Sequence, residues 1–228
     1  LLLTALHHKG ESAAEIAGAA RAMRRHMVKV KTRHPLVLDT CGTGGIGSEL
    51  FNISTAAAIV AAAAGVKVAK HGNRSITSKS GSADVLTALG VNIAAPPAAV
   101  ERCLDEQGIC FCFAPAFHPA MKHVAPVRKQ LGFATIFNLL GPLCNPAGAA
   151  RQVLGVGKRD LQPTMAEVLK LLGTEHAIVV HGTDGIGELS LAAATDVIEI
   201  RGNQERRFSW LPRDFGLATA GHDALRVA

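Results

Sequence analysis

A glycine-rich loop is the first feature of this sequence that could do chemistry. Gly42, Gly44 and Gly47 form a G-x-G-x-x-G pattern directly after an apolar run of strand length. Because glycine has no Cβ, such a loop can bring backbone N–H groups close to phosphate oxygens. In a dinucleotide-binding fold the pattern needs a helix at once and an acidic residue about 20 positions further on. No Asp or Glu occurs between Glu49 and Asp84, so a dinucleotide is disfavoured.

The acid-free interval that follows the loop is basic and polar. Its members are Lys67, Lys70, His71, Asn73, Arg74, Ser75, Thr77, Ser78, Lys79, Ser80 and Ser82. Asn52, Ser54 and Thr55 are placed to cap the next helix, whose N-terminal amides and dipole favour negative charge. Taken singly, the loop fits a tight turn and these three residues fit ordinary helix capping. Together with the basic stretch they predict a site for a ligand richer in negative charge than a carboxylate.

Other catalytic patterns are missing from the sequence. It contains no G-x-S-x-G, H-E-x-x-H or G-x-x-x-x-G-K-[ST] motif, which disfavours serine hydrolases, zinc proteases and P-loop proteins. His118 and His123 have no third ligand nearby, so we interpret them as solvated helix residues. An N-terminal basic cluster without interleaved aromatic residues is interpreted as a solvated helix face, not a nucleic-acid site. That cluster comprises Arg21, Arg24, Arg25, Lys29, Lys31 and Arg33.

Alternating segments of strand and helix length must position these residues. Apolar runs of strand length lie at 36–38, 66–69, 109–113, 135–137, 153–156, 178–180 and 197–200, and predicted helices lie at 55–64, 83–89, 118–131 and 161–172. This alternation predicts an α/β fold, with a mostly parallel central sheet flanked by helices. Residues 1–34 have helical spacing, with an N-cap at Ser12 and Glu15 three positions later. We therefore expect a smaller all-helical lobe at 1–34, joined by helix 118–131, and an α/β domain at 35–228.

Composition sets the broad class. The 228 residues are 48% hydrophobic with a formal net charge of +6, which excludes a disordered chain. The most apolar stretch, 53–69, is mostly alanine and falls short of the ~20 strongly apolar residues that cross a bilayer. Five cysteines without a C-x-x-C pair suggest neither a disulfide framework nor a structural zinc site, so we expect a cytoplasmic protein. Because Leu1–Leu6 resembles the interior of a helix, we interpret the start as a cut helix and not as a signal peptide.

Several longer motifs resemble those of the anthranilate phosphoribosyltransferases of tryptophan biosynthesis. They are Asp39-Thr40-Cys41-Gly42-Thr43-Gly44-Gly45, Phe51-Asn52-Ile53-Ser54-Thr55, Ala69-Lys70-His71-Gly72-Asn73-Arg74, Gly81-Ser82-Ala83-Asp84, His118-Pro119-Ala120-Met121-Lys122, Pro126-Val127-Arg128, Phe137-Asn138-Leu139-Leu140-Gly141-Pro142-Leu143-Cys144-Asn145-Pro146 and Val180-His181-Gly182. Each motif alone is weak, but the set is specific and covers roughly residues 1–200. The resemblance implies a nucleoside phosphorylase/phosphoribosyltransferase-like fold with both ends of the chain incomplete. It also implies a homodimer through the helical lobe.

The resemblance also implies roles for individual residues. The 5-phosphoribosyl-1-diphosphate donor would be held by Gly42, Thr43, Gly44, Gly45, Asn52, Ile53, Ser54, Thr55, Lys70, His71, Gly72, Asn73, Arg74, Ser78 and Ser82. Gly42, Asn73 and Arg128 would contact anthranilate, and Ser54 and Glu188 would serve Mg²⁺. Breaking the anomeric C–O bond places negative charge on the departing diphosphate, so Lys70 is the expected catalytic residue. Arg128 suits the anthranilate carboxylate through a two-pronged hydrogen bond.

Three positions depart from the family pattern at the donor and metal site. Ile46 stands where an Asp usually follows the glycine pair, and Leu50 replaces a hydroxyl residue. Gly187 replaces the Asp that normally precedes Glu188, which leaves Glu188, with Asp184 as a further acid, for the metal. Because Mg²⁺ requires several oxygen ligands, we expect weakened metal binding.

Two alternatives to phosphoribosyl transfer stay open at this point. A pyrimidine nucleoside phosphorylase-like enzyme shares the general architecture and a glycine loop, but is expected to differ in the loop at 70–74. A non-catalytic, nucleic-acid-binding relative is favoured by Ile46, Gly187, the net charge and the basic helix. Its DNA affinity would fall steeply with salt.

Overall fold

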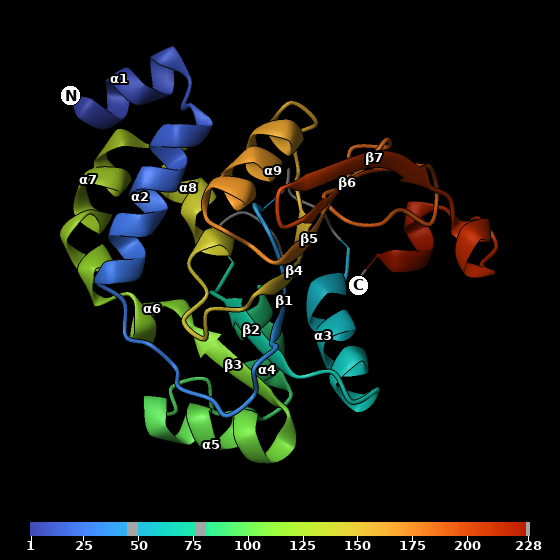
Figure 1. Ribbon diagram of the computed structural model, residues 1–228, viewed down its shortest axis with the longest axis horizontal. Coiled ribbons are helices and arrows are strands. Elements are labelled where there is room, and N and C mark those ends of the chain that lie inside the picture. Colours follow the sequence, from blue (N-terminus) through green and yellow to red (C-terminus); the bar gives the residue numbers. More distant parts are fainter. Residues whose placement is uncertain (45–49, 76–80, 227–228) are drawn as a thin grey trace.

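The computed structural model describes residues 1–44, 50–75 and 81–226 (Figure 1). The α-helices are α1 (Leu2–Lys9), α2 (Ala13–Arg25), α3 (Ile53–Ala63), α4 (Ser82–Ala88), α5 (Pro97–Gln107), α6 (Ala114–Phe117), α7 (Ala125–Leu131), α8 (Phe137–Leu140) and α9 (Leu161–Leu171). The strands are β1 (Leu38–Gly42), β2 (Val68–Gly72), β3 (Ile109–Phe113), β4 (Arg151–Gly155), β5 (His176–Gly182), β6 (Thr195–Arg201) and β7 (Gln204–Trp210). Short 3₁₀ turns are η1 (Pro119–His123), η2 (Gly141–Leu143), η3 (Pro212–Phe215) and η4 (His222–Leu225). Within these described residues no helix is both long and apolar enough to span a bilayer.

One sheet organises the α/β part of the chain. Its strand order is β3-β2-β1-β4-β5-β6-β7. The first five strands are parallel, β6 is antiparallel to β5, and β7 is antiparallel to β6. Helix α3 packs against β1 and β2, α5 against β3, and α9 against β5 and β6. The predicted class, a mostly parallel sheet flanked by helices, is confirmed.

The strand order reverses at β1. After β1 the chain moves to one side to form β2 and β3, and it later returns to the other side to form β4 and β5. Loops that leave β1 and β4 therefore diverge in opposite directions at the carboxyl edge of the sheet. Open α/β sheets bind ligands at such a reversal of strand order.

The N-terminal helices pack against the α/β part through α2. Ser12 Oγ accepts a hydrogen bond from the Glu15 N–H, and the Glu15 carboxylate accepts one from the Ser12 N–H, so the predicted N-cap is confirmed. On the opposite face of α2, Ile16, Ala17 and Ala20 are fully buried in the same core as residues of α9. Helix α8 packs against α2, and α7 lies at the same end of the molecule (Figure 1). The His7 ring lies 4.4 Å from the Phe133 ring, which joins α1 to the turn after α7.

The helical segment is shorter than predicted, because it ends at Arg25 and not near residue 34. After His26, whose N–H still donates to Met23 O, the backbone bonds with distant segments. Val28 N–H donates to Phe117 O (2.8 Å), and Val30 N–H donates to Pro146 O (3.0 Å). Residues 28–30 thus form a connection that is fastened onto the α/β part.

Two predicted elements are wrong in detail. Residues 135–137 are not a strand: Phe137 begins α8, because Ile136 and Leu140, four positions apart, are buried together in the α2 core. The single helix predicted at 118–131 is divided into η1 and α7. Pro126 has no N–H and could not donate to the fourth preceding carbonyl, so a continuous α-helix is broken there.

Strand β7 was not predicted at all. Its sequence, Gln-Glu-Arg-Arg-Phe-Ser-Trp, alternates weakly and is largely exposed, as expected for an edge strand. It pairs with β6 through the tight turn at Gly202, whose φ of 56° is unstrained only for glycine.

Candidate active site

The predicted donor residues gather where β1, β2 and β4 end. Gly42 ends β1 and is paired in register with Gly155, which ends β4, while Gly72 ends β2 on the other side of β1. Thr43 and Gly44 follow directly, and Thr43 N–H donates to Gly155 O (2.9 Å). Their backbones therefore lie where the strand order reverses. Gly45 and Ser78 of the predicted set, and the substituted Ile46, lie outside the described residues.

The N-terminus of α3 lies against the same strand ends. Asn52 Oδ1 accepts hydrogen bonds from the Thr55 N–H (3.0 Å) and the Ser54 hydroxyl (3.2 Å). Thr40 Oγ1 donates to Ser54 O (2.8 Å), which fastens the first turn of α3 to β1. Ile53 is the first helical residue. The positive end of α3 is thus fixed beside the end of β1, an arrangement that suits a phosphate.

Lys70 lies at the centre of this group and is only 3% exposed. Its Nζ donates to Thr40 O (2.6 Å) and to Ser54 Oγ (3.1 Å), so the side chain joins β2 to both β1 and α3. Burial lowers the pKa of Lys70, while the charge of Asp39 acts in the opposite direction. Burial likewise raises the pKa of Asp39, a carboxyl in β1 with no exposed surface. Since two of the three ammonium hydrogens are used by the protein, one remains for an anion.

Glu188 reaches this centre because two glycines let its loop cross β4. A Cβ on Gly155 would lie 1.8 Å from Gly187 O, so only glycine permits this crossing. Glu188 is half-buried, and burial raises its pKa to about 7, although the positive charge of Lys70 opposes that rise. Asp184, the other acid considered for the metal, accepts hydrogen bonds from the Ser190 hydroxyl and from His222 Nε2. It is therefore engaged elsewhere.

The segment after β2 folds back onto its own strand. A Cβ on Gly72 would lie 2.1 Å from Ser82 Oγ, so the start of α4 packs directly on the end of β2. Asn73 is exposed, and its carbonyl accepts the Ala83 N–H (3.2 Å). Arg74 pairs with Asp84 through atoms 2.9 Å apart. Asn73 and Arg74 thus flank the same edge of the sheet as Lys70.

The side chain of His71 has a different environment from that of Lys70, because neighbours in a strand point to opposite faces. His71 Nδ1 lies 2.9 Å from Gly141 O, and His71 Nε2 lies 3.1 Å from His118 Nε2. With Nδ1 donating to the carbonyl, His71 Nε2 accepts from His118 Nε2, so the His71 ring is neutral and the His118 ring needs only its Nε2 proton. Burial lowers the pKa of each ring to about 4. His118 is 4% exposed, so its interpretation as a solvated helix residue was wrong.

This histidine pair predicts acid sensitivity of the fold. An unfolded histidine takes up a proton near pH 6.5, but folded His71 and His118 do so only near pH 4. The unfolded chain therefore binds more protons between these values, and stability falls as the pH drops through that window and is full above it. We expect each ring to lower the free energy of unfolding by about 3 kcal/mol as it is protonated. The measurement is the urea midpoint, followed from pH about 7 to about 4.5. His118→Gln should flatten the slope, whereas exposed His123→Gln should not; equal slopes in all three proteins would contradict the assignment.

Arg128 lies on α7, apart from the strand ends. Its guanidinium lies 3.3 Å from Asn138 Oδ1 and 5.8 Å from the centre of the Phe137 ring, so α8 fixes its direction. Burial lowers the pKa of Arg128, which stays a cation. The described contacts do not join it to Gly42 or Asn73, its expected partners around anthranilate.

The oxygen donors near Lys70 suit Mg²⁺. This ion prefers oxygen ligands and is usually held by one or two carboxylates together with water and substrate phosphates. The Ser54 hydroxyl and the Glu188 carboxylate, the two predicted metal residues, both lie beside Lys70. Over the described ranges, no group of three or more His, Cys, Asp or Glu side chains could hold a metal without a ligand's help. These residues fit a magnesium ion that arrives with a phosphorylated substrate.

Reasoning from sequence missed two features of this centre. It assigned no role to Asp39, the buried countercharge of Lys70, although a lone acid inside an apolar strand is a usable signal. It also could not foresee that the C-terminal segment reaches this region. Phe51 N–H donates to Leu225 O (2.9 Å), and Leu50 forms a bridge with Arg226.

Comparisons with known proteins agree with this architecture. Residues 34–228 match the model of the glycosyl transferase family α/β domain, and residues 1–27 match that family's helical bundle domain. Fold and site thus define a glycosyl transferase of this two-domain class. The anthranilate phosphoribosyltransferase of Rhodopirellula baltica is 53% identical over 227 residues, which cover 100% of this chain and 66% of that protein.

Solved structures give the same result. The crystal structure of anthranilate phosphoribosyltransferase from Thermus thermophilus is 49% identical, with a TM-score of 0.92, and is matched over 100% of this chain and 67% of that chain. The Saccharomyces cerevisiae enzyme in complex with PRPP and Mg is 35% identical, with a TM-score of 0.89, over 99% of this chain and 62% of that chain. The chain belongs to the anthranilate phosphoribosyltransferase family and spans about two thirds of the length of its relatives.

Proposed function

We propose that this protein transfers the 5-phosphoribosyl group of 5-phosphoribosyl-1-diphosphate to the amine of anthranilate, giving N-(5-phosphoribosyl)anthranilate and diphosphate. The observation that carries the proposal is the hydrogen-bonded junction of Thr40, Ser54 and Lys70. It fixes the positive end of α3 and a buried ammonium group beside a glycine-ended strand. The yeast relative bound to PRPP and Mg supports the same assignment of donor and metal.

The residues of the chain have separable tasks in this reaction. As the anomeric C–O bond breaks, negative charge develops on the departing diphosphate, where the amides of the loop after β1 and the Lys70 ammonium stabilise it. Ser54 and Glu188 would hold Mg²⁺, which when bound supplies further neutralisation of the diphosphate. Anthranilate needs to be positioned more than activated, because a neutral aryl amine is already nucleophilic. Arg128 would orient its carboxylate, and the amine proton leaves as the new C–N bond forms.

An anthranilate fluorescence assay tests the proposal directly. When the full-length chain is assayed, anthranilate should be consumed only if the phosphoribosyl donor and Mg²⁺ are both present. Consumption of a pyrimidine nucleoside with phosphate instead would assign the phosphorylase alternative. No turnover together with salt-sensitive DNA binding would assign the nucleic-acid-binding alternative. The proposal includes a homodimer and a cytoplasmic location, which sedimentation and cell fractionation would test.

Restoring an acid at position 187 should change both metal use and stability. A Cβ there would lie 3.1 Å from Gly157 N and 3.2 Å from Val156 C, so the backbone must yield by a few tenths of an ångström. We expect Gly187→Asp to lower the free energy of unfolding by about 1–3 kcal/mol. It should also lower the Mg²⁺ concentration needed for half-maximal turnover, because a second carboxylate joins Glu188.

Gly187→Ala is the matched control for that variant. Its Cβ crowds the same backbone atoms, but it adds no carboxylate. It should therefore lower the free energy of unfolding by a similar amount and leave the affinity for Mg²⁺ unchanged. Equal magnesium responses in the Asp and Ala variants would mean that the metal is held elsewhere.

A further inference from the structure

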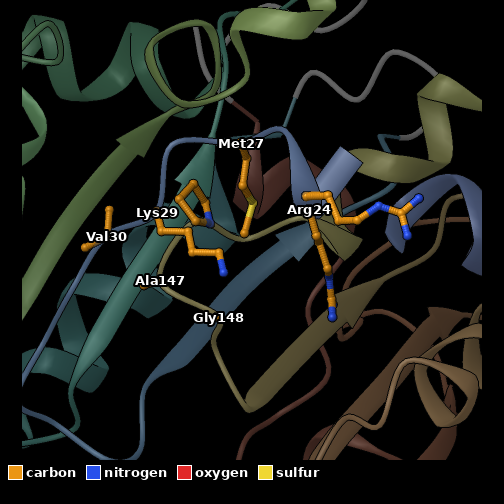
Figure 2. A pocket seen from close by; sticks show the side chains of 8 residues that line it. Arg24, Met27, Lys29, Val30, Ala147 and Gly148 are labelled. Atoms are coloured by element: carbon orange, nitrogen blue, oxygen red, sulfur yellow. The ribbon is translucent and has the colours of Figure 1, made fainter. Parts of the chain in front are cut away.

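A hollow of about 380 Å³ lies away from the strand ends, where α2 meets the α/β part of the chain (Figure 2). Its wall is formed by the end of α2, by the connection that follows and by the loop before β4. The lining residues are Arg24, Arg25, Met27, Lys29, Val30, Pro146, Ala147 and Gly148. None of them belongs to the proposed donor, metal or anthranilate residues.

Three of these lining side chains are cations, and none is an acid. Arg24 Nε donates to Leu143 O (2.7 Å), which fixes the guanidinium at the wall. Arg25 and Lys29 are exposed and form no ion pair with any residue that the structure describes. Cations in the last turn of α2 stabilise its negative end, which accounts for the two arginines but not for Lys29.

In a neighbouring hollow, by contrast, acids accompany the cations. That second hollow, of about 600 Å³, is also lined by three cations, Lys31, Arg33 and Arg102. Its wall carries three acids as well, Glu101, Asp105 and Glu106. The Asp105 side chain accepts the Arg33 N–H (3.1 Å), and the Glu101 side chain accepts the Lys31 N–H (2.8 Å). Its positive charge is therefore balanced by the protein, whereas that of the first hollow is not.

We propose that the first hollow binds a compact polyanion, a small molecule with two or more phosphate or carboxylate groups. Three cations line a space large enough for such a molecule, and the wall contains no acid to balance their charge. The remaining lining residues are apolar and none is aromatic, so the wall offers no stacking surface to a nucleobase. The site joins the connection after α2 to the loop before β4. A bound anion would therefore bridge the helical and α/β parts.

Methyl NMR with inorganic pyrophosphate as the probe separates this hollow from the donor site. Met27 lines the hollow, whereas Met165 is fully buried in the core beside α2. The Met27 methyl signal, assigned with Met27→Leu, should shift saturably during the titration, while the Met165 signal stays still. Binding of pyrophosphate at the strand ends would not produce this pattern, so the result is independent of the proposed transferase activity.

Two double variants test the cations. Arg25→Gln/Lys29→Gln should raise the pyrophosphate concentration for half-maximal Met27 shift by about tenfold or more, because two charge-assisted contacts are lost. Lys31→Gln/Arg102→Gln, in the neighbouring hollow, should leave it unchanged. All four residues lie on or near the surface, and a thermal melt confirms folding. An unmoved Met27 signal, or equal midpoints in the two double variants, would overturn the proposal. So would a DNA duplex that competes more tightly than pyrophosphate.

Discussion

Replacing Lys70 by Met should lower the rate of phosphoribosyl transfer by about 100- to 1,000-fold, because the departing diphosphate loses a buried positive charge. The same change should lower the free energy of unfolding by about 3–5 kcal/mol. The reason is that Lys70 is the countercharge of buried Asp39 and joins Thr40 to Ser54. Steady-state kinetics at saturating donor and urea denaturation measure the two effects separately.

A second substitution separates catalysis from stability. In the Lys70→Met/Asp39→Asn variant the unpaired buried charge is gone, so much of the lost stability should return. The rate should stay low, because the ammonium group is still missing. Recovery of the rate together with stability would show that Lys70 acts only by holding the strands together.

Replacing Arg128 by Lys should raise the Michaelis constant for anthranilate by about 10- to 100-fold and leave that for the phosphoribosyl donor nearly unchanged. The charge is kept, but the two-pronged hydrogen bond to a carboxylate is lost. The contact with the Phe137 ring, 5.8 Å from the guanidinium, would also weaken. Initial rates over both substrate concentrations give the two constants.

Lys129→Gln on the same helix is the control for Arg128. Lys129 is exposed, so its loss should change neither constant. If Arg128→Lys raised both Michaelis constants equally, Arg128 would be a structural residue that holds α7 against α8.

Most of the α/β architecture was predictable because its strands are apolar and short. The run at 109–113 coincides with β3. The helix predicted at 83–89 is shifted by one residue from α4, and the one predicted at 161–172 is one residue longer than α9. Failures occurred where tertiary contacts outweigh local pattern. Residues 135–137 have strand composition but lead into α8, which begins at Phe137 and packs on α2. The polar edge strand β7 depends on its pairing with β6.

The candidate site was predictable in its membership but not in its contacts. Motifs placed Gly42, Ser54 and Lys70 in one site, and the strand order brings them together. No spacing in the sequence shows that Lys70 is buried and hydrogen-bonded to the chain itself, because those partners come from other elements. The pairing of His71 with His118 was hidden for the same reason, since 47 positions separate the two rings.

One short turn near the end of the described chain has a mechanical consequence. The Leu225 carbonyl accepts a hydrogen bond from Phe51, at the entrance to α3. The His222 ring is hydrogen-bonded to Asp184, in the loop that carries Glu188. Local opening of the entrance to α3 and of the loop that carries Glu188 should therefore be coupled. Amide hydrogens of Phe51 and Ile186 ought to exchange with solvent in step, and clipping the chain before His222 should speed both together.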